Sequence, residues 1–335
     1  MTLTESRTNE FRRNMLLERL LMELNSELQP SEQALLRRYQ NNKKMPYPLI
    51  LVMGPLRSGT TLFMQWLANT GLVAYPTNFL SRFYTAPIIG AKIQLLLTDP
   101  RFNFRDELGE FGQQAEYFSE NGKTKGVLAP NEFWYFWRRF LAEPGRDVWT
   151  DDQLRRSMDA DTMLAEILGM MQVFQKPFAA KGMLFNYNIS FLDSIFEQIL
   201  FVQIKRDLVA NVASVLDARK RQLGSEKSWY SFIIPEYDHL KNLDPVTQAT
   251  GQVYYINQAV EQGLAVVDES RKLQVTYEDF CADPKCLFEK IKTKLSLNNY
   301  EPYQGPFSFV SSRKPDYSVT MSVEQALCAF DSRLP

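Results

Sequence analysis

Three stretches of the chain combine a short apolar run with a helical pattern after it. Residues 48–54 (PLILVMG) form a continuous apolar run that ends in Gly, as expected of a strand buried on both faces of a sheet. The helical spacing that follows, LFMQWLANTG, ends at Gly71. Residues 199–207 (ILFVQIKRD) and 272–280 (KLQVTYEDF) predict two more strands, each followed by a helix. This alternation predicts an α/β fold with a parallel sheet and helices on both faces.

The N-terminal part of the chain carries apolar residues at helical spacing over residues 11–41. Pro30 interrupts the pattern, and Ser31 is a residue type that caps the start of a helix, so two short amphipathic helices are expected. The chain length of 335 residues allows one large domain or two small ones. We therefore predict N-terminal helices (1–45) packed on a single α/β domain (46–335).

The composition indicates a folded chain and excludes a few activities. Apolar residues make up 45% of the chain, and no apolar run approaches the ~20 residues that span a bilayer. Lys plus Arg (38) balance Asp plus Glu (39), which argues against a nucleic-acid partner. The three cysteines lack metal-ligand spacing, and the N-terminus lacks a signal-peptide core. We expect a soluble, cytoplasmic protein without a metal centre, whose oligomeric state the sequence leaves open.

A glycine-rich loop, residues 54–61 (GPLRSGTT), lies between the first predicted strand and its helix. The backbone N–H groups of such a loop and the helix dipole point at one place and bind phosphate. The spacing matches a nucleotide-binding P-loop, but Thr60 stands where that motif has Lys, and the cation of the loop is Arg57. Kinases and ATPases use that Lys together with Mg²⁺. Two alternatives stay open here, a P-loop kinase or NTPase with a displaced cation and a non-catalytic nucleotide-binding protein.

The loop resembles the 5′-phosphosulfate loop of sulfotransferases that use 3′-phosphoadenosine 5′-phosphosulfate (PAPS), which reads [KR]-S-G-T-T. Two further motifs follow in the order of that family. In FVQIKRDLVANVAS, Arg206 and Ser214 have the spacing of the residues that hold the 3′-phosphate. Residues 277–284 (YEDFCADP) resemble a segment whose Tyr lies near the adenine. The chain is similar to a soluble, bacterial-type member of the family over roughly residues 48–295, which implies a P-loop-like sheet with helical insertions forming the acceptor site.

The resemblance implies a reaction and a set of site residues. A sulfuryl group would pass from PAPS to a hydroxyl or amine of a small-molecule, carbohydrate or lipid acceptor, releasing adenosine 3′,5′-bisphosphate (PAP) without a metal. Arg57 is expected to stabilise the leaving 5′-phosphate, and Lys181 to contact the sulfuryl oxygens. The residues expected to bind the donor are Arg57, Ser58, Gly59, Thr60, Thr61, Arg206, Ser214 and Tyr277.

The general base does not follow from the resemblance. Met183 stands where the family has a catalytic His. The acceptor hydroxyl must still lose its proton to a carboxylate or an imidazole within hydrogen-bond reach. Glu116 is the first candidate, and Glu132 and His239 are the alternatives.

Other positions also depart from the family pattern. Leu62 replaces an aromatic residue after the two threonines, which leaves Trp229 as a candidate for stacking on the adenine. Arg313 and Lys314 are candidate substitutes for a C-terminal basic segment. Aromatic residues concentrate between positions 102 and 140, where we expect them to serve both the core and an acceptor pocket: Phe102, Phe104, Phe111, Tyr117, Phe118, Phe133, Trp134, Tyr135, Phe136, Trp137 and Phe140.

Overall fold

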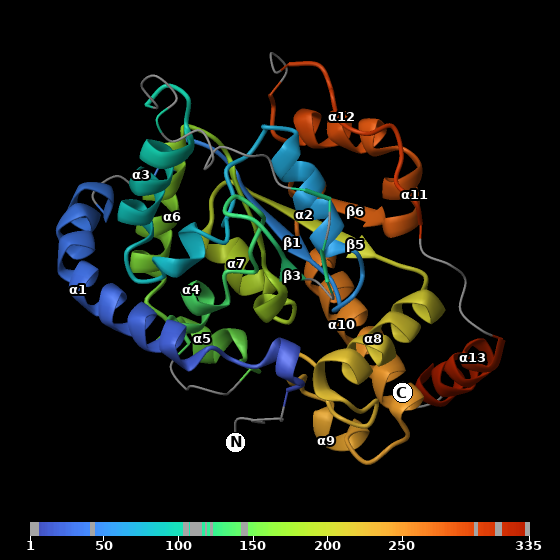
Figure 1. Cartoon of the computed structure of the whole chain (residues 1–335). Helices are drawn as coiled ribbons and strands as arrows, with labels where there is room; N and C mark the ends of the chain where they lie inside the picture. Colours follow the sequence, from blue (N-terminus) through green and yellow to red (C-terminus); the bar gives the residue numbers. More distant parts are fainter. Residues whose placement is uncertain are drawn as a thin grey trace.

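A parallel sheet of four strands forms the centre of the molecule (Figure 1). The strands follow the order β4-β1-β5-β6 across the sheet, and each neighbouring pair is parallel. The α/β class and the parallel sheet are therefore confirmed. The computed structural model describes residues 7–40, 44–102, 107, 116–117, 119–120, 123–141, 147–297, 301–311 and 317–331. The strands are β1 (Leu49–Met53), β4 (Phe178–Lys181), β5 (Ile199–Lys205) and β6 (Lys272–Thr276), with a separate hairpin of β2 (Ser119–Glu120) and β3 (Lys123–Thr124).

Helices cover both faces of the sheet (Figure 1). They are η1 (Asn9–Phe11), α1 (Met15–Gln40), α2 (Thr60–Asn69), η2 (Leu80–Arg82), α3 (Pro87–Thr98), α4 (Trp134–Arg138), α5 (Asp151–Ser157), α6 (Ala160–Phe174), η5 (Met183–Phe185), α7 (Ile189–Ile195), α8 (Leu208–Leu223), α9 (Tyr237–Leu240), α10 (Pro245–Ala265), η6 (Glu269–Arg271), α11 (Tyr277–Ala282), α12 (Pro284–Lys294) and α13 (Tyr317–Asp331). Within the described residues, none of these helices is long and apolar enough to cross a membrane.

Strand β1 separates two hydrophobic cores. Its five residues are all buried, and the side chains alternate between the two sides of the sheet. Leu51 belongs to the larger core, together with residues of α6, α7, α8 and α10. Ile50 and Val52 belong to the smaller core, together with residues of α2, α11 and α12. Burial on both faces is the physical reason why this strand has a continuous apolar sequence.

The N-terminal region forms the single helix α1, so the prediction of two helices broken at Pro30 is wrong. Contacts on both sides of the proline hold the helix to its neighbours. Before it, Asn25 Nδ2 donates to the Arg82 carbonyl at 2.7 Å. After it, the buried Glu32 carboxylate accepts the backbone N–H groups of Ile88 and Ile89 at the start of α3. These contacts offset the cost of about 3 kcal/mol that a proline brings to a helix interior.

The sequence patterns also misplace the end of β6 and miss β4 and α13. Strand β6 ends at Thr276, before the predicted end at residue 280, because the Thr276 hydroxyl accepts the N–H of Asp279 and starts α11. Strand β4 has four residues, too few for a periodicity to identify. Helix α13 lies in a segment without a clear pattern, and its Phe330 ring packs on the rings of Tyr254 and Tyr255 in α10.

Candidate functional site

The glycine-rich loop connects the carboxyl end of β1 to the N-terminus of α2, as predicted. Three of its residues have positive φ angles: 135° at Gly54, 62° at Arg57 and 99° at Gly59. A non-glycine residue such as Arg57 rarely adopts this left-handed region. A Cβ atom at Gly59 would lie 2.1 Å from the ring of Tyr277, so the loop and the start of α11 approach each other only because residue 59 is glycine.

Two fully buried amide side chains hold this loop in place. Asn186 Oδ1 accepts the N–H of Gly54 at 3.0 Å, and its Nδ2 donates to the carbonyl of the same residue at 2.9 Å. From α8, Asn211 Nδ2 donates to the Leu56 carbonyl at 2.8 Å. Sequence reasoning missed both residues, since an isolated Asn has no signature that marks such a contact. The amides stabilise the backbone on which the unusual conformation of the loop depends.

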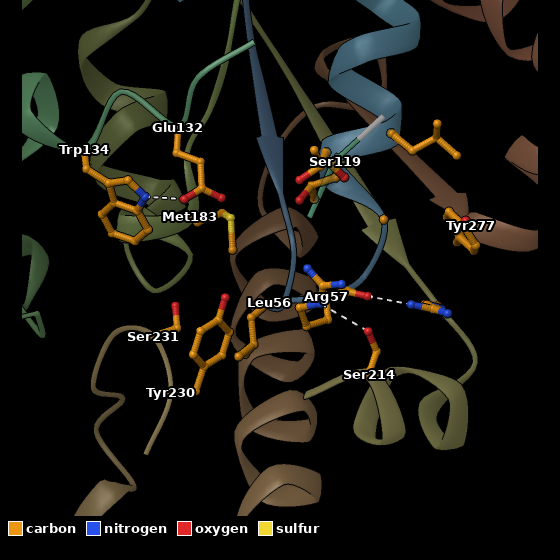
Figure 2. A pocket seen from close by; sticks show the side chains of 15 residues that line it. Leu56, Arg57, Ser119, Glu132, Trp134, Met183, Ser214, Tyr230, Ser231 and Tyr277 are labelled. Atoms are coloured by element: carbon orange, nitrogen blue, oxygen red, sulfur yellow. Dashed lines mark hydrogen bonds between the residues drawn. The ribbon is translucent and has the colours of Figure 1, made fainter. Parts of the chain in front are cut away.

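A pocket lies where the carboxyl ends of β1, β5 and β6 meet, and the loop forms part of its wall (Figure 2). Ser58, expected to bind the donor, is fully buried and does not line the pocket. Its Oγ has no hydrogen-bond partner within the described part of the chain. The other seven residues expected to bind the donor all line the pocket: Arg57, Gly59, Thr60, Thr61, Arg206, Ser214 and Tyr277.

Two guanidinium groups share one wall of the pocket. Arg57 Nε donates to Ser214 Oγ at 3.1 Å, and Arg206 Nη1 donates to the Arg57 carbonyl at 2.9 Å (Figure 2). The Arg206 guanidinium also lies 5.0 Å from the centroid of the Tyr277 ring. Burial lowers the pKa of Arg206, and the charge of Arg57 acts in the same direction. Two like charges held this close favour an anion between them.

Lys181, expected to contact the sulfuryl oxygens, lies at the end of β4, is 4% exposed and does not itself line the pocket. Its Nζ donates to Thr61 Oγ1 at 2.8 Å and to Glu132 Oε1 at 3.1 Å. The Trp134 indole N–H donates to the other carboxylate oxygen of Glu132. Burial raises the pKa of Glu132, but the Lys181 ammonium, the indole N–H and the Arg57 charge together hold it below its usual value. Glu132 is therefore ionised at neutral pH.

The three candidate bases occupy different places. Glu132 lines the pocket, and its side chain is 34% exposed. Glu116, the first candidate from the sequence, has an exposed side chain that does not line the pocket, and its backbone carbonyl accepts from Gln65 Nε2. His239 is exposed on α9 and does not line the pocket either. Position therefore favours Glu132 and corrects the order of the candidates.

The tryptophan proposed to stack on the adenine points elsewhere. Trp229 is 5% exposed, and its ring packs edge-on against Tyr237 with the centroids 4.8 Å apart. Its indole N–H donates to the Phe232 carbonyl. The prediction for Trp229 is wrong, because this side chain is buried in the core and does not line the pocket. The next residue, Tyr230, lines the pocket instead, and so does Leu62.

The described aromatic residues between positions 102 and 140 divide into three groups. The larger core buries Phe133, Phe136, Trp137 and Phe140, the pocket is lined by Trp134, and the exposed ones are Phe102, Tyr117 and Tyr135. Phe133 and Phe136 stack with centroids 4.4 Å apart in the larger core, as expected of core residues. Five residues named from the sequence lie outside the described part of the chain: Phe104, Phe111, Phe118, Arg313 and Lys314.

The pocket has two ends of different composition, with Arg57 between them (Figure 2). One end carries positive charge and hydroxyl groups, and the other carries a carboxylate and larger side chains. We call the first the loop end and define it by Arg206, Ser214 and Tyr277 with the loop itself; we call the second the aromatic end and define it by Glu132, Trp134, Met183, Tyr230 and Ser231.

The residues of the loop end fit a ligand that carries phosphate or sulfate. Two guanidinium groups and the N-terminus of α2 surround one space, and such groups bind oxyanions through charge-assisted hydrogen bonds. Over the described part of the chain, no three His, Cys, Asp or Glu side chains gather as metal ligands would.

Comparisons with known proteins agree with this geometry. A model of the sulfotransferase family matches residues 48–302. The fold is similar to that of sulfotransferase STF1 from Mycobacterium tuberculosis H37Rv, with a TM-score of 0.51 and 14% identity over 89% of this chain and 76% of that one. Sulfotransferase STF9 from Mycobacterium avium gives the same TM-score and identity over 98% of this chain and 86% of that one. No curated protein matches the sequence.

Proposed function

Because this chain belongs to the sulfotransferase family, we propose that it transfers a sulfuryl group from PAPS to a hydroxyl or amine acceptor and releases PAP. One observation carries the proposal: Arg57 and Arg206, from different parts of the sequence, line one pocket whose loop is built to bind an anion. Lys181 lies behind this lining, where it donates to Thr61 and Glu132, two residues that line the pocket. A donor with a 3′-phosphate and a 5′-phosphosulfate needs separate anion contacts of this kind.

The loop end would bind the donor. In our proposal, Arg57 and the N–H groups of the loop bind the 5′-phosphate and stabilise the charge that it gains as the sulfuryl group leaves. Arg206 and Ser214 would hold the 3′-phosphate. Their orientation is supported by the hydrogen bonds that join both of them to Arg57. Hydrogen-bonding groups that are held in place before the reaction lower the barrier more than mobile ones do, because they need no reorganisation.

Glu132 and Lys181 would serve the transfer itself. In the proposed step the acceptor oxygen forms a bond to sulfur, the bond from sulfur to the 5′-phosphate oxygen breaks, and the acceptor proton passes to the Glu132 carboxylate. An ionised carboxylate can take this proton, and its bonds to Lys181 and Trp134 orient it. Lys181 would place its positive charge against the sulfuryl oxygens.

Calorimetric titration with PAP, and in parallel with ATP and Mg²⁺, tests the donor part of the proposal. We expect PAP to bind much more tightly than ATP. Tight binding of ATP with Mg²⁺ and none of PAP would instead support a P-loop kinase or NTPase. Transfer of labelled sulfate from PAPS to any acceptor then distinguishes an enzyme from a protein that only binds the nucleotide.

A further inference from the structure

The N-terminal segment, residues 7–11, packs on the C-terminal end of α8. The Thr8 N–H donates to the Gln222 carbonyl at 3.0 Å, and the Thr8 hydroxyl donates to the Arg221 carbonyl at 2.9 Å. The last carbonyl groups of a helix have no partner within the helix, so the segment supplies donors that this end of α8 requires. Phe11 is 7% exposed, which shows that the segment is held by packing as well.

The same segment also contacts the β2–β3 hairpin. Lys123 Nζ lies 5.1 Å from the centroid of the Phe11 ring. The hairpin carries Ser119, which lines the pocket, and the loop after α8 carries Tyr230, which lines it from the aromatic end. In Figure 1 the segment runs below β3 towards the loops that follow α8. Residues 7–11 therefore connect two walls of the pocket.

A chain of hydrogen bonds leads from this segment into the aromatic end. Arg7 Nη1 donates to Gln222 Oε1 at 3.2 Å, and Gln222 Nε2 donates to the Tyr230 hydroxyl at 3.0 Å. Because that hydroxyl accepts from Gln222, its own hydrogen can be donated to another group. Burial raises the pKa of Tyr230, which keeps this hydrogen in place at neutral pH. Figure 2 shows the Tyr230 hydroxyl on the side that faces Met183 and Glu132.

Two exposed cations, Arg7 and Lys123, lie near this end, outside the residues that line the pocket. Neither forms an ion pair within the described part of the chain. Burial and the charge of Arg7 lower the pKa of Lys123, against the opposite effect of the Glu132 carboxylate, so the two positive groups are close enough to repel each other. The nearby carboxylate, Glu132, is already paired with Lys181. An anion bound between Arg7 and Lys123 would relieve their repulsion.

From these contacts we infer that the acceptor is an alcohol or phenol that also carries an anionic group, a carboxylate or a phosphate. The anionic group binds Arg7 and Lys123, and the reacting hydroxyl lies by Tyr230 and Glu132. The N-terminal segment is thus part of the acceptor site. This inference rests on the proposed sulfuryl transfer, and it adds the class of substrate.

Matched pairs of hydroxyl compounds test the inference. Transfer from labelled PAPS is measured for 4-hydroxyphenylacetate against 4-hydroxyphenylacetamide, for 3-hydroxybutyrate against 3-hydroxybutyramide, and for 4-hydroxyphenyl phosphate against phenol. We expect kcat/KM to be at least about tenfold higher for the charged members, since a charge-assisted hydrogen bond contributes about that factor. Arg7→Gln and Lys123→Gln should each reduce this preference about five- to tenfold. Arg155→Gln, which removes an exposed cation on α5, serves as the matched control and should leave it unchanged.

Two outcomes overturn the inference. One is the absence of any anionic compound among those that are sulfated, and the other is an equal kcat/KM for charged and neutral members of each pair. Binding of PAP is measured on the same protein samples. If the unaltered protein does not bind PAP, the proposed function is overturned. If it binds PAP but sulfates charged and neutral acceptors equally well, only the inference on the acceptor is overturned.

Discussion

The loop end and the aromatic end of the pocket are built in different ways. Arg206 and Tyr277 come directly after β5 and β6, and the loop comes directly after β1. Parallel strands bring their carboxyl ends to one edge of the sheet, so these residues meet wherever such a sheet forms. At the aromatic end, Glu132 comes from the connection between β3 and α4 and Tyr230 from the connection between α8 and α9, and no general rule of the fold brings them together.

This difference has a consequence for the chemistry. The loop end is defined by backbone geometry and by short contacts such as Arg57 Nε to Ser214 Oγ, which suits a donor that does not vary. The aromatic end consists of segments that can differ in length and sequence without disturbing the sheet. Substitutions at the two ends should therefore affect different quantities, the affinity for the nucleotide at one and proton transfer or acceptor choice at the other.

The largest effect is expected at the aromatic end. Glu132→Gln should reduce kcat by about 10²- to 10⁴-fold because it removes the proposed general base, while the affinity for PAP changes little. Glu116→Gln, at an exposed position outside the pocket, is the matched control. Rates of sulfuryl transfer with labelled PAPS measure both variants. A large loss with Glu116→Gln and a small one with Glu132→Gln would restore Glu116 as the base.

The pH dependence offers a second check on Glu132. Pairing with Lys181 helps to hold the pKa of this carboxylate below its usual value, so the active, ionised form persists into acid and kcat falls only as the pH drops through that lowered value. The stability that ionised Glu132 contributes follows the same sign. It is present above the pKa of the unfolded chain and is lost as the pH falls through the folded pKa. The acid limb of kcat should be absent from Glu132→Gln.

At the centre of the pocket, Arg57→Ala should lower turnover by about 10²- to 10³-fold, comparable to the loss of one preorganised donor at a reacting group. The thermal unfolding temperature should change little, because the guanidinium is half-buried at the pocket wall. Arg221→Ala, an exposed cation on α8, serves as the control. Turnover near that of the unaltered protein would rule out the proposed role of Arg57.

Arg206→Ala should lower the affinity for nucleotides that carry a 3′-phosphate. Binding of PAP should weaken about 10- to 100-fold, the contribution of hydrogen bonds to a charged group. Binding of adenosine 5′-phosphate, which lacks the 3′-phosphate, should weaken much less. Calorimetry with the two nucleotides gives the ratio directly. An equal loss for both would assign Arg206 to the 5′-phosphate or to the support of the loop.

The smallest effect is expected from the buried amides behind the loop. Asn186→Leu removes both hydrogen bonds to Gly54 and should weaken the binding of PAP about five- to tenfold. The binding of adenosine 3′-phosphate, which lacks the 5′-phosphate, should stay the same. Asn188→Leu is the matched control, since Asn188 is equally buried and donates two hydrogen bonds away from the loop. Asn211→Leu repeats the test from α8. If both nucleotides weaken in parallel, the amides support the fold only.

Local patterns were sufficient to predict the parallel sheet, three of its four strands and the glycine-rich loop. The run PLILVMG is apolar throughout because β1 is buried on both faces, and the loop residues after it are adjacent in sequence. Arg206 follows its strand directly, and Ser214 lies in the helix that comes next, so the family motif that these two residues resemble is also local in the sequence. The buried strand, the loop and the segment from Arg206 to Ser214 each extend over only a few residues, so the sequence alone is enough to predict them.

The tertiary structure alone decided the features that depend on distant contacts. Glu32 holds α1 to α3 across Pro30 with partners 56 and 57 residues away, against the local preference of proline to break a helix. The preference for Glu132 over Glu116 rests on a pocket that Glu132 lines and Glu116 does not, and Glu132 is held there by Lys181, 49 residues away. Trp229 and Tyr230 are neighbouring aromatic residues, and no local pattern predicts that Trp229 is buried while Tyr230 lines the pocket. Packing decides between them only once the chain has folded.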